Sequence, residues 1–220
     1  MISATMNQML PLVSVILPVF NRRYVIERAL NSVIAQTFQD FELLIVDDGS
    51  TDGLEERVIP EILHRPNWRY LKHANRRLAW TRNIGLFAAL AKLVTFLDSD
   101  DEYLPEHLAL RVDFMTQHPE VDIIHGGYEL IGPEEYHWVR DVRHPARKIH
   151  LNDCCLGATL FGKKDVFLQA GGFPLVNFSS EYYLLQQLEK RFCVKRVFFS
   201  TYRYHTESED RLCRRQENQA

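Results

Sequence analysis

The sequence predicts an α/β fold in which a mostly parallel central sheet is flanked by helices. Short apolar runs alternate with helical patterns between residues 13 and 97, and this alternation is typical of parallel sheets. Each run is apolar at nearly every position, as expected for strands that are buried on both faces. With 46% hydrophobic and 25% charged residues, the 220-residue chain has enough apolar side chains for a well-packed core.

Four strands and three helices are expected in the first half of the chain. The first strand, residues 13–17, is stopped by Pro18, and apolar residues then recur at helical spacing from Val25 to Ile34. Thr51 is expected to cap the second helix. The other expected elements are strands at 41–46, 68–71 and 93–97, a second helix that ends near His64, and a third helix over 78–91.

The second half is less regular and forms the small mixed C-terminal part of the predicted fold. Residues 132–153 are rich in charge, histidine and proline and are interpreted as a loop, and acceptor contacts are expected from residues 136–156. A single domain over residues 1–206 is expected, followed by a polar C-terminal tail at 207–220. The regular elements expected here are a helix from Pro105 through Met115, a strand at 121–125, a helix at 184–192 and a strand at 194–199.

Composition and charge exclude several classes of protein. The net charge of −3 provides no basic field to recruit nucleic acid. Residues 1–10 have no positive residue and no long apolar core, so a signal peptide is not expected. No apolar stretch approaches the roughly 18 residues of a membrane span. We therefore expect a cytoplasmic protein, with peripheral attachment at the inner face of the membrane left open.

The cysteines do not indicate a metal site. Cys154, Cys155, Cys193 and Cys213 have no Cys-x-x-Cys spacing and no clustered histidines beside them. Reduced cysteines of an intracellular protein are the better interpretation.

Acidic residues follow the predicted strands at the point where each strand ends. Asp98, Asp100 and Asp101 come after the strand at 93–97, and Asp47–Asp48 end the strand at 41–46. Ligands of open parallel sheets bind beyond the carboxyl ends of the strands, so one crevice is expected to hold both clusters. Carboxylate oxygens favour Mg²⁺ or Mn²⁺, and magnesium takes only one or two of them beside water and substrate phosphates. This pattern predicts an enzyme that handles a diphosphate.

Each of these residues also has a purely structural interpretation. Asp47–Ser50 is compatible with a turn and helix cap, and Asp98–Asp101 with the solvated entry of a helix. Arg82 either belongs to a solvated face or binds a diphosphate through its planar fork of donors. Glu181 is either a carboxylate at a helix start or a general base, and His205 is either structural or a metal ligand.

Gly157-x4-Gly162-Lys163-Lys164 nearly matches a phosphate-binding loop. Its last position is lysine, which cannot supply a hydroxyl to magnesium, and its interior is too apolar for a phosphate cradle. We interpret it as a strand and a turn. The chain has neither a Gly-x-Gly-x-x-Gly fingerprint nor a Gly-x-Ser-x-Gly nucleophile elbow.

An ordered series of motifs spans nearly the whole chain. They are 13–21 (VSVILPVFN), 41–52 (FELLIVDDGSTD), 82–86 (RNIGL), 96–101 (FLDSDD), 171–173 (GGF) and 202–205 (YRYH). Together these segments resemble the motifs of family 2 glycosyltransferases of the GT-A fold. The resemblance implies inverting transfer of a sugar from a nucleotide-sugar donor, with UDP as the expected carrier. The implied acceptor is the hydroxyl of a saccharide, of a lipid-linked substrate or of another molecule.

The resemblance also implies a role for individual residues. Phe20 would stack on the nucleobase, with Pro18 and Asn21 beside it, and Asp48 would bind the N–H edge of the base. Asp98 would contact the ribose next to Ser99, and Arg82 would lie near the diphosphate. Glu181 would be the catalytic base. Asp100 would ligate Mg²⁺ or Mn²⁺, with His205 as the second protein ligand.

Two positions depart from the family pattern. Ser180–Tyr183 retains only one acid, Glu181, where the family has several, and Arg77 stands where glycine is common. The first departure keeps a second function open, a nucleotide-sugar-binding module that has lost catalysis. A sugar-phosphate nucleotidyltransferase is disfavoured, because its glycine-rich loop is missing after Leu17.

Overall fold

The computed structural model describes residues 10–207. Residues 1–9 and 208–220 lie outside the described residues. The expected absence of a signal peptide, Cys213 and all but the first residue of the expected tail at 207–220 fall there.

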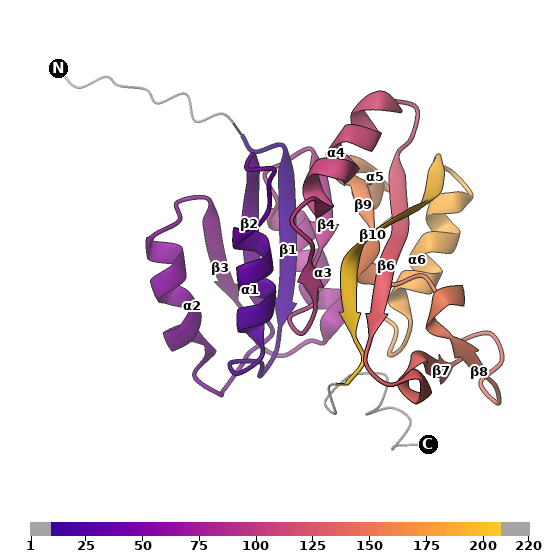
Figure 1. Cartoon of the computed structure of the whole chain (residues 1–220), viewed down its shortest axis with the longest axis horizontal. Helices are drawn as coiled ribbons and strands as arrows, with labels where there is room; N and C mark the ends of the chain where they lie inside the picture. Colours follow the sequence, from indigo (N-terminus) through magenta and orange to yellow (C-terminus); the bar gives the residue numbers. More distant parts are fainter. Residues whose placement is uncertain (1–9, 208–220) are drawn as a thin grey trace.

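An eight-stranded sheet in the order β3-β2-β1-β4-β9-β6-β10-β5 forms the centre of the molecule (Figure 1). Pairing is parallel among β1 to β4 and between β6 and β10, whereas β9 and β5 run antiparallel to their neighbours. All the long strands therefore end at the same edge. The strands are β1 Val13–Val19, β2 Phe41–Asp47, β3 Trp68–Lys72, β4 Leu93–Phe96, β5 Glu102–Tyr103, β6 Ile123–Ile131, β9 Phe161–Lys163 and β10 Val194–His205.

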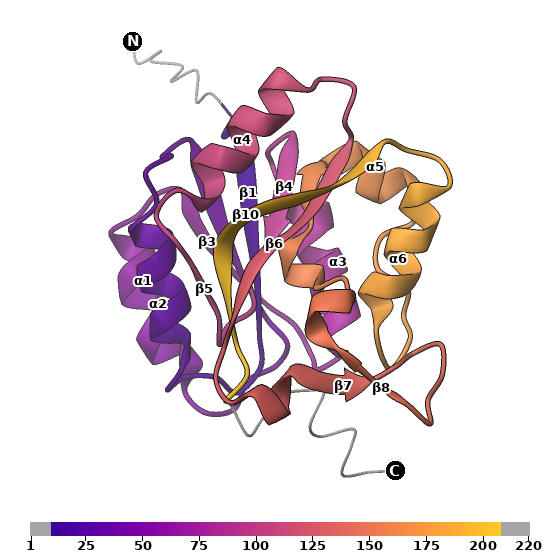
Figure 2. The same ribbon diagram turned by 45° about the vertical axis from the view of Figure 1, so that its right-hand side comes forward.

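Helices cover both faces of the sheet, which confirms the predicted α/β class (Figure 2). Apolar residues of α1, α2 and α4 pack into one core cluster, and those of α3, α5 and α6 into another on the opposite face. The helices are α1 Ile26–Ile34, α2 Leu54–Leu63, α3 Leu78–Ala88, α4 His107–Gln117, α5 Lys164–Gln169 and α6 Ser180–Glu189. None of the helices within residues 10–207 is long and apolar enough to cross a bilayer.

Two helix boundaries differ from the prediction, and hydrogen bonds to side chains occur at both. Gly53 rather than Thr51 is the N-cap residue of helix α2, and the Leu54 N–H that follows it donates to the Asp52 side chain at 3.2 Å. Helix α3 ends at Ala88, short of residue 91. There the N–H of Leu90 donates to the buried Glu42 carboxylate. A side-chain acceptor of this kind takes the place of the backbone carbonyl that would continue the helix.

The second half contains more regular structure than the sequence pattern predicted. Residues 132–153, expected as a loop, include the antiparallel hairpin of β7 Trp138–Arg140 and β8 Lys148–His150. Strand β10 continues to His205, beyond the predicted end at residue 199. Its pairing with β6 is irregular between Val197 and Tyr202. Helix α6 starts at Ser180, four residues before the expected start.

Candidate active site

The ends of β1, β2 and β4 bring the predicted site residues to one edge of the sheet. Val19 pairs with Asp47, and the Leu97 N–H donates to the Ile16 carbonyl of β1 at 3.0 Å. Phe20 directly follows β1 and is one-third exposed, so an apolar ring faces outward at this edge. Pro18 is buried within β1.

Asp48 and Asn21 each organise a loop of this edge. The two carboxylate oxygens of Asp48 accept the backbone N–H groups of Arg76 (2.6 Å) and Arg77 (2.9 Å). Asn21 accepts the Thr51 N–H through its side chain, and its own N–H donates to the Ser50 hydroxyl at 2.9 Å. Both residues thus position the loops around the strand ends. Their contacts to a nucleotide stay predictions.

Arg82 joins the end of β4 to the start of α6. Its guanidinium is fully buried, with Nη2 2.7 Å from Asp98 and Nη1 4.0 Å from the Glu181 carboxylate. The planar group also lies over the Phe173 ring, at 5.2 Å from its centroid. A Cβ at Gly157 would lie 2.7 Å from Nη1 of Arg82, so only glycine allows this close approach. The structure thus brings together three of the predicted site residues.

Two nitrogens of Arg82 remain available to a ligand. Nε and Nη1 are buried and have no hydrogen-bond partner in the described part of the chain. Buried polar groups are almost always hydrogen-bonded in folded proteins, so unpartnered donors between two carboxylates indicate a place for a polar ligand. The chemistry of a guanidinium fits an anionic or hydroxyl-rich one.

Glu181 has the environment of a general base. It lies in the first turn of α6, and a quarter of its side chain is exposed. Removal of water by the surrounding protein raises the pKa of its carboxyl above the ordinary 4.5, and the nearby Arg82 offsets part of this increase. A carboxylate with a raised pKa is a stronger proton acceptor while it still ionises near neutral pH.

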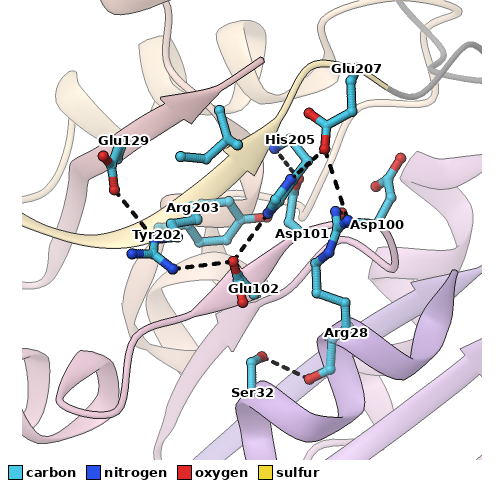
Figure 3. Close-up of polar contacts among 12 residues, drawn as sticks. Arg28, Ser32, Asp100, Asp101, Glu102, Glu129, Tyr202, Arg203, His205 and Glu207 are labelled. Carbon is cyan, nitrogen blue, oxygen red and sulfur yellow. Dashed lines mark hydrogen bonds and ion pairs between the residues drawn. The ribbon is translucent and has the colours of Figure 1, made fainter.

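The segment 98–101 contains two partly exposed residues, Asp98 and Asp100, and two buried ones. Asp101 is buried, accepts the Tyr202 hydroxyl at 2.5 Å and accepts the backbone N–H of His205 at 2.8 Å. Burial, with Asp100 and Asp98 beside it, raises the pKa of Asp101 well above the ordinary value. Ser99 is buried as well. Asp101 therefore fixes the end of β10 against this segment (Figure 3).

The imidazole of His205 contacts the carboxylates of Glu102 and Glu207 (Figure 3). Its Nε2 is 3.2 Å from Glu102 and its Nδ1 is 2.8 Å from Glu207. Arg28 donates to the Asp100 backbone carbonyl at 3.1 Å and lies 3.9 Å from Glu207. No group of three or more His, Cys, Asp or Glu side chains arranged to hold a cation occurs within residues 10–207. The metal-ligand roles of Asp100 and His205 stay predictions.

Left-handed backbone conformations occur at this edge in residues other than glycine. Within residues 10–207 they are Asn21 (φ 51°), Arg77 (φ 72°) and Ser179 (φ 53°), which follow β1, precede α3 and precede α6. Such conformations are costly and cluster at functional sites. Arg77 also has ψ 166°, a region that is otherwise almost restricted to glycine. Arg77, which stands where the family commonly has glycine, therefore adopts a backbone conformation typical of glycine. Its side chain is hydrogen-bonded to Asn177.

Replacing Arg77 by glycine is expected to stabilise the fold by about 1 kcal/mol. Relief of about 1–3 kcal/mol of backbone strain outweighs the roughly 0.5–1 kcal/mol that the extra freedom of glycine costs. The free energy of unfolding from urea denaturation measures the change. The neighbouring Arg76→Gly, at a position with ordinary negative φ, is the matched control and should destabilise. Equal destabilisation by both variants would contradict the strain at Arg77.

Comparison with known proteins decides the family. The sequence profile of glycosyl transferase family 2 matches residues 14–182, which is most of the chain. The chain belongs to this family. The glycosyltransferase is also similar to the E. coli UDP-Glc:alpha-D-GlcNAc-diphosphoundecaprenol beta-1,3-glucosyltransferase WfgD. The two are 29% identical over 175 residues, covering 79% of this chain and 68% of WfgD.

Solved structures confirm the expected GT-A fold of the glycosyltransferase. Residues 1–349 of S. aureus TarS in complex with UDP-GlcNAc superpose with a TM-score of 0.74 at 20% identity, covering 91% of this chain and 60% of that one. The mannosyltransferase PcManGT of Pyrobaculum calidifontis, in complex with GDP-Man and Mn²⁺, gives 0.70 at 18% identity, covering 92% and 59%. The chain spans less than half the length of several curated relatives that it matches.

The glycosyltransferase also uses residues that the sequence pattern left without a role. Asn83 holds the turn before α6, with its side chain accepting the Phe173 N–H at 2.8 Å and donating to the Phe173 carbonyl at 2.9 Å. Gly172, with φ 71°, leaves room for that side chain. The Arg82–Asn83 pair therefore links α3 to the segment that carries Glu181. The Arg82–Asn83 motif was visible in the sequence. The residues that these two side chains contact lie far away in the sequence, so the contacts could not be inferred from it.

Proposed function

We propose that this glycosyltransferase transfers a sugar from a UDP-sugar to an acceptor hydroxyl with inversion at the anomeric carbon. The observation that carries the proposal is the buried guanidinium of Arg82. It lies between Asp98 and Glu181, at the carboxyl ends of parallel strands, with two nitrogens unpartnered within residues 10–207. A fixed cation suits an anionic donor, and a carboxylate of raised pKa suits a general base.

Glu181 acts as the general base in the proposed mechanism. The acceptor hydroxyl attacks the anomeric carbon from the side opposite the leaving diphosphate, and its proton passes to the Glu181 carboxylate. The bond from the anomeric carbon to the diphosphate oxygen breaks, which inverts the configuration and releases UDP. Arg82 lies 4.0 Å from Glu181, and two of its N–H groups have no hydrogen-bond partner within residues 10–207. Fixed geometry of donor, acceptor and base supplies much of the remaining acceleration.

A divalent cation fits the donor chemistry of the acidic segment. Asp100 supplies the hard carboxylate oxygens that Mg²⁺ and Mn²⁺ prefer, and these ions need only one or two protein carboxylates beside phosphate oxygens. His205 joins it only by exchanging its contact with Glu102 or Glu207. When bound on Asp100, the ion would neutralise charge on the diphosphate. The Mn²⁺ in the PcManGT complex supports this part of the proposal.

Release of UDP from UDP-glucose, UDP-galactose and UDP-GlcNAc, measured with and without Mn²⁺, tests the function. We expect slow release that depends on the metal and increases when a suitable acceptor is added. Nucleotide binding without release, across all donors and acceptors, would instead favour the non-catalytic binding module. The specific support for that alternative is the single remaining acid at Ser180–Tyr183.

The acid limb of the pH–rate profile is expected to lie above pH 4.5. Only the ionised Glu181 accepts a proton, and the surrounding protein raises its pKa above that ordinary value. Activity should therefore fall as pH decreases through the raised pKa and recover as pH rises through it. The pH dependence of kcat/KM measures this pKa in the free enzyme. A limb below 4.5, with donor affinity constant over the same range, would contradict the assignment.

A further inference from the structure

The hairpin of β7 and β8 concentrates positive charge on an acidic chain. Residues 138–150 contain four basic residues and one acidic residue, a net charge of +3. The other 207 residues contain 22 basic and 28 acidic residues, a net charge of −6. A local excess of this kind is not a consequence of average composition and indicates an anionic partner.

The pairing of the two strands separates an apolar face from a cationic face. Trp138 pairs with His150 and Arg140 with Lys148, which places these four residues on one side of the ribbon. Val139 and Ile149 point to the other side, where they pack with Leu151 and Leu156 in a small core cluster. The first face is turned away from this core, and Trp138 on it is 45% exposed.

Two arginines of the hairpin have no counter-charge. Arg140 and Arg147 are exposed, and their side chains form no ion pair or hydrogen bond within residues 10–207. Arg143, by contrast, is paired with Asp141 at 3.2 Å. An exposed tryptophan beside unpaired arginines is the composition of protein surfaces that contact the headgroup region of a bilayer.

The hairpin lies next to the active site. It projects from the end of the molecule toward which β6 and β10 point (Figures 1 and 2). Seven positions after His150, Gly157 approaches Arg82 and Glu181. Seven residues span at most about 25 Å, so a surface bound by the hairpin comes within that distance of the catalytic edge.

We propose that the exposed face of the β7–β8 hairpin docks the enzyme on an anionic phospholipid surface and thereby presents the site to a membrane-embedded acceptor. The choice of acceptor rests on the proposed function, whereas the docking does not. Arginine guanidiniums bind lipid phosphates and Trp138 enters the interface. Each basic residue near an anionic bilayer strengthens binding about fivefold, and the effect is screened by salt.

Flotation with vesicles in the absence of any donor tests the docking. The full chain should bind vesicles of phosphatidylcholine with one-quarter phosphatidylglycerol more tightly than pure phosphatidylcholine, and high salt should remove the difference. The double variant Arg140→Ala/Arg147→Ala should lower the partition coefficient about 30-fold. Lys92→Ala/Lys195→Ala is the charge-matched control, because both exposed lysines lie at the opposite, amino ends of β4 and β10. It should change binding by less than about twofold.

Three outcomes of the flotation assay would overturn the proposal. They are equal binding of both vesicle types, unchanged binding by the arginine variant, and equal losses in the arginine and lysine variants. UDP release without vesicles should be unchanged in Arg140→Ala/Arg147→Ala, which separates docking from catalysis. Loss of that release would assign the arginines to the donor site and would also overturn the proposal. A failure of the parent enzyme to release UDP affects only the proposed function.

Discussion

Replacing Glu181 by glutamine is expected to lower kcat by about 10²–10⁴-fold while changing donor affinity by less than about threefold. The amide keeps the size of the side chain but cannot accept a proton from the acceptor hydroxyl. In the proposed site the donor contacts come from the strand ends and Arg82, so they should persist in the variant. Steady-state turnover, with UDP affinity measured by calorimetry, separates the two quantities.

The matched control for Glu181→Gln is Glu189→Gln. Glu189 is the last residue of the same helix and is exposed, so its replacement should leave kcat unchanged within about twofold. Glu181→Asp adds a test of reach, because it keeps the charge and shortens the side chain by one methylene. Its activity should lie between that of the parent and that of Glu181→Gln. Turnover unaffected in Glu181→Gln would remove this residue from the mechanism.

Replacing Arg82 by methionine is expected to destabilise the fold by about 3 kcal/mol at neutral pH and to abolish donor turnover. The variant leaves Asp98 and Glu181 without their shared cation, and breaking a buried pair in this way costs about 3–5 kcal/mol. Solvent reaches about a quarter of each carboxylate side chain, which places the expected value at the low end. Urea denaturation at several pH values measures the loss.

The pH dependence distinguishes this electrostatic loss from lost packing. Burial already raises the pKa of the Glu181 carboxyl, and loss of the Arg82 charge that offsets this increase raises it further on folding. A group with a raised folded-state pKa stabilises at low pH and loses that contribution as pH rises. The deficit of Arg82→Met should therefore shrink as pH falls toward 5. A deficit independent of pH would indicate lost packing against Phe173 instead. Arg191→Met, at an exposed position, should change stability by less than about 0.5 kcal/mol.

The sequence pattern located the strands that carry the site because buried parallel strands are apolar at consecutive positions. Strands β1, β2 and β4 gave this signal, and the acids that follow β2 and β4 lie at one edge of the sheet as expected. The hairpin gave no such signal, because β7 and β8 have three residues each and several are charged. A period-2 pattern cannot be recognised in so short a strand.

The contacts within the site depend on tertiary structure and could not be inferred from spacing. Arg82 and Glu181 are nearly one hundred positions apart, and Gly157 allows their approach from a third segment. Asp48 has the residue type expected for a ligand contact, yet backbone N–H groups occupy both of its oxygens. The glycine-type conformation of Arg77 was indicated only by a departure from the family pattern.

A crystal structure of the enzyme with UDP and Mn²⁺ tests the central claim most directly. The account predicts the nucleobase beside Phe20, the diphosphate between Asp98 and Asp100, and open space between its terminal phosphate and Glu181 for the sugar and acceptor. Donor nitrogens of Arg82 that now lack a partner within the described chain should face that space. UDP bound away from the carboxyl ends of β1, β2 and β4, or Glu181 turned away from the diphosphate, would contradict it.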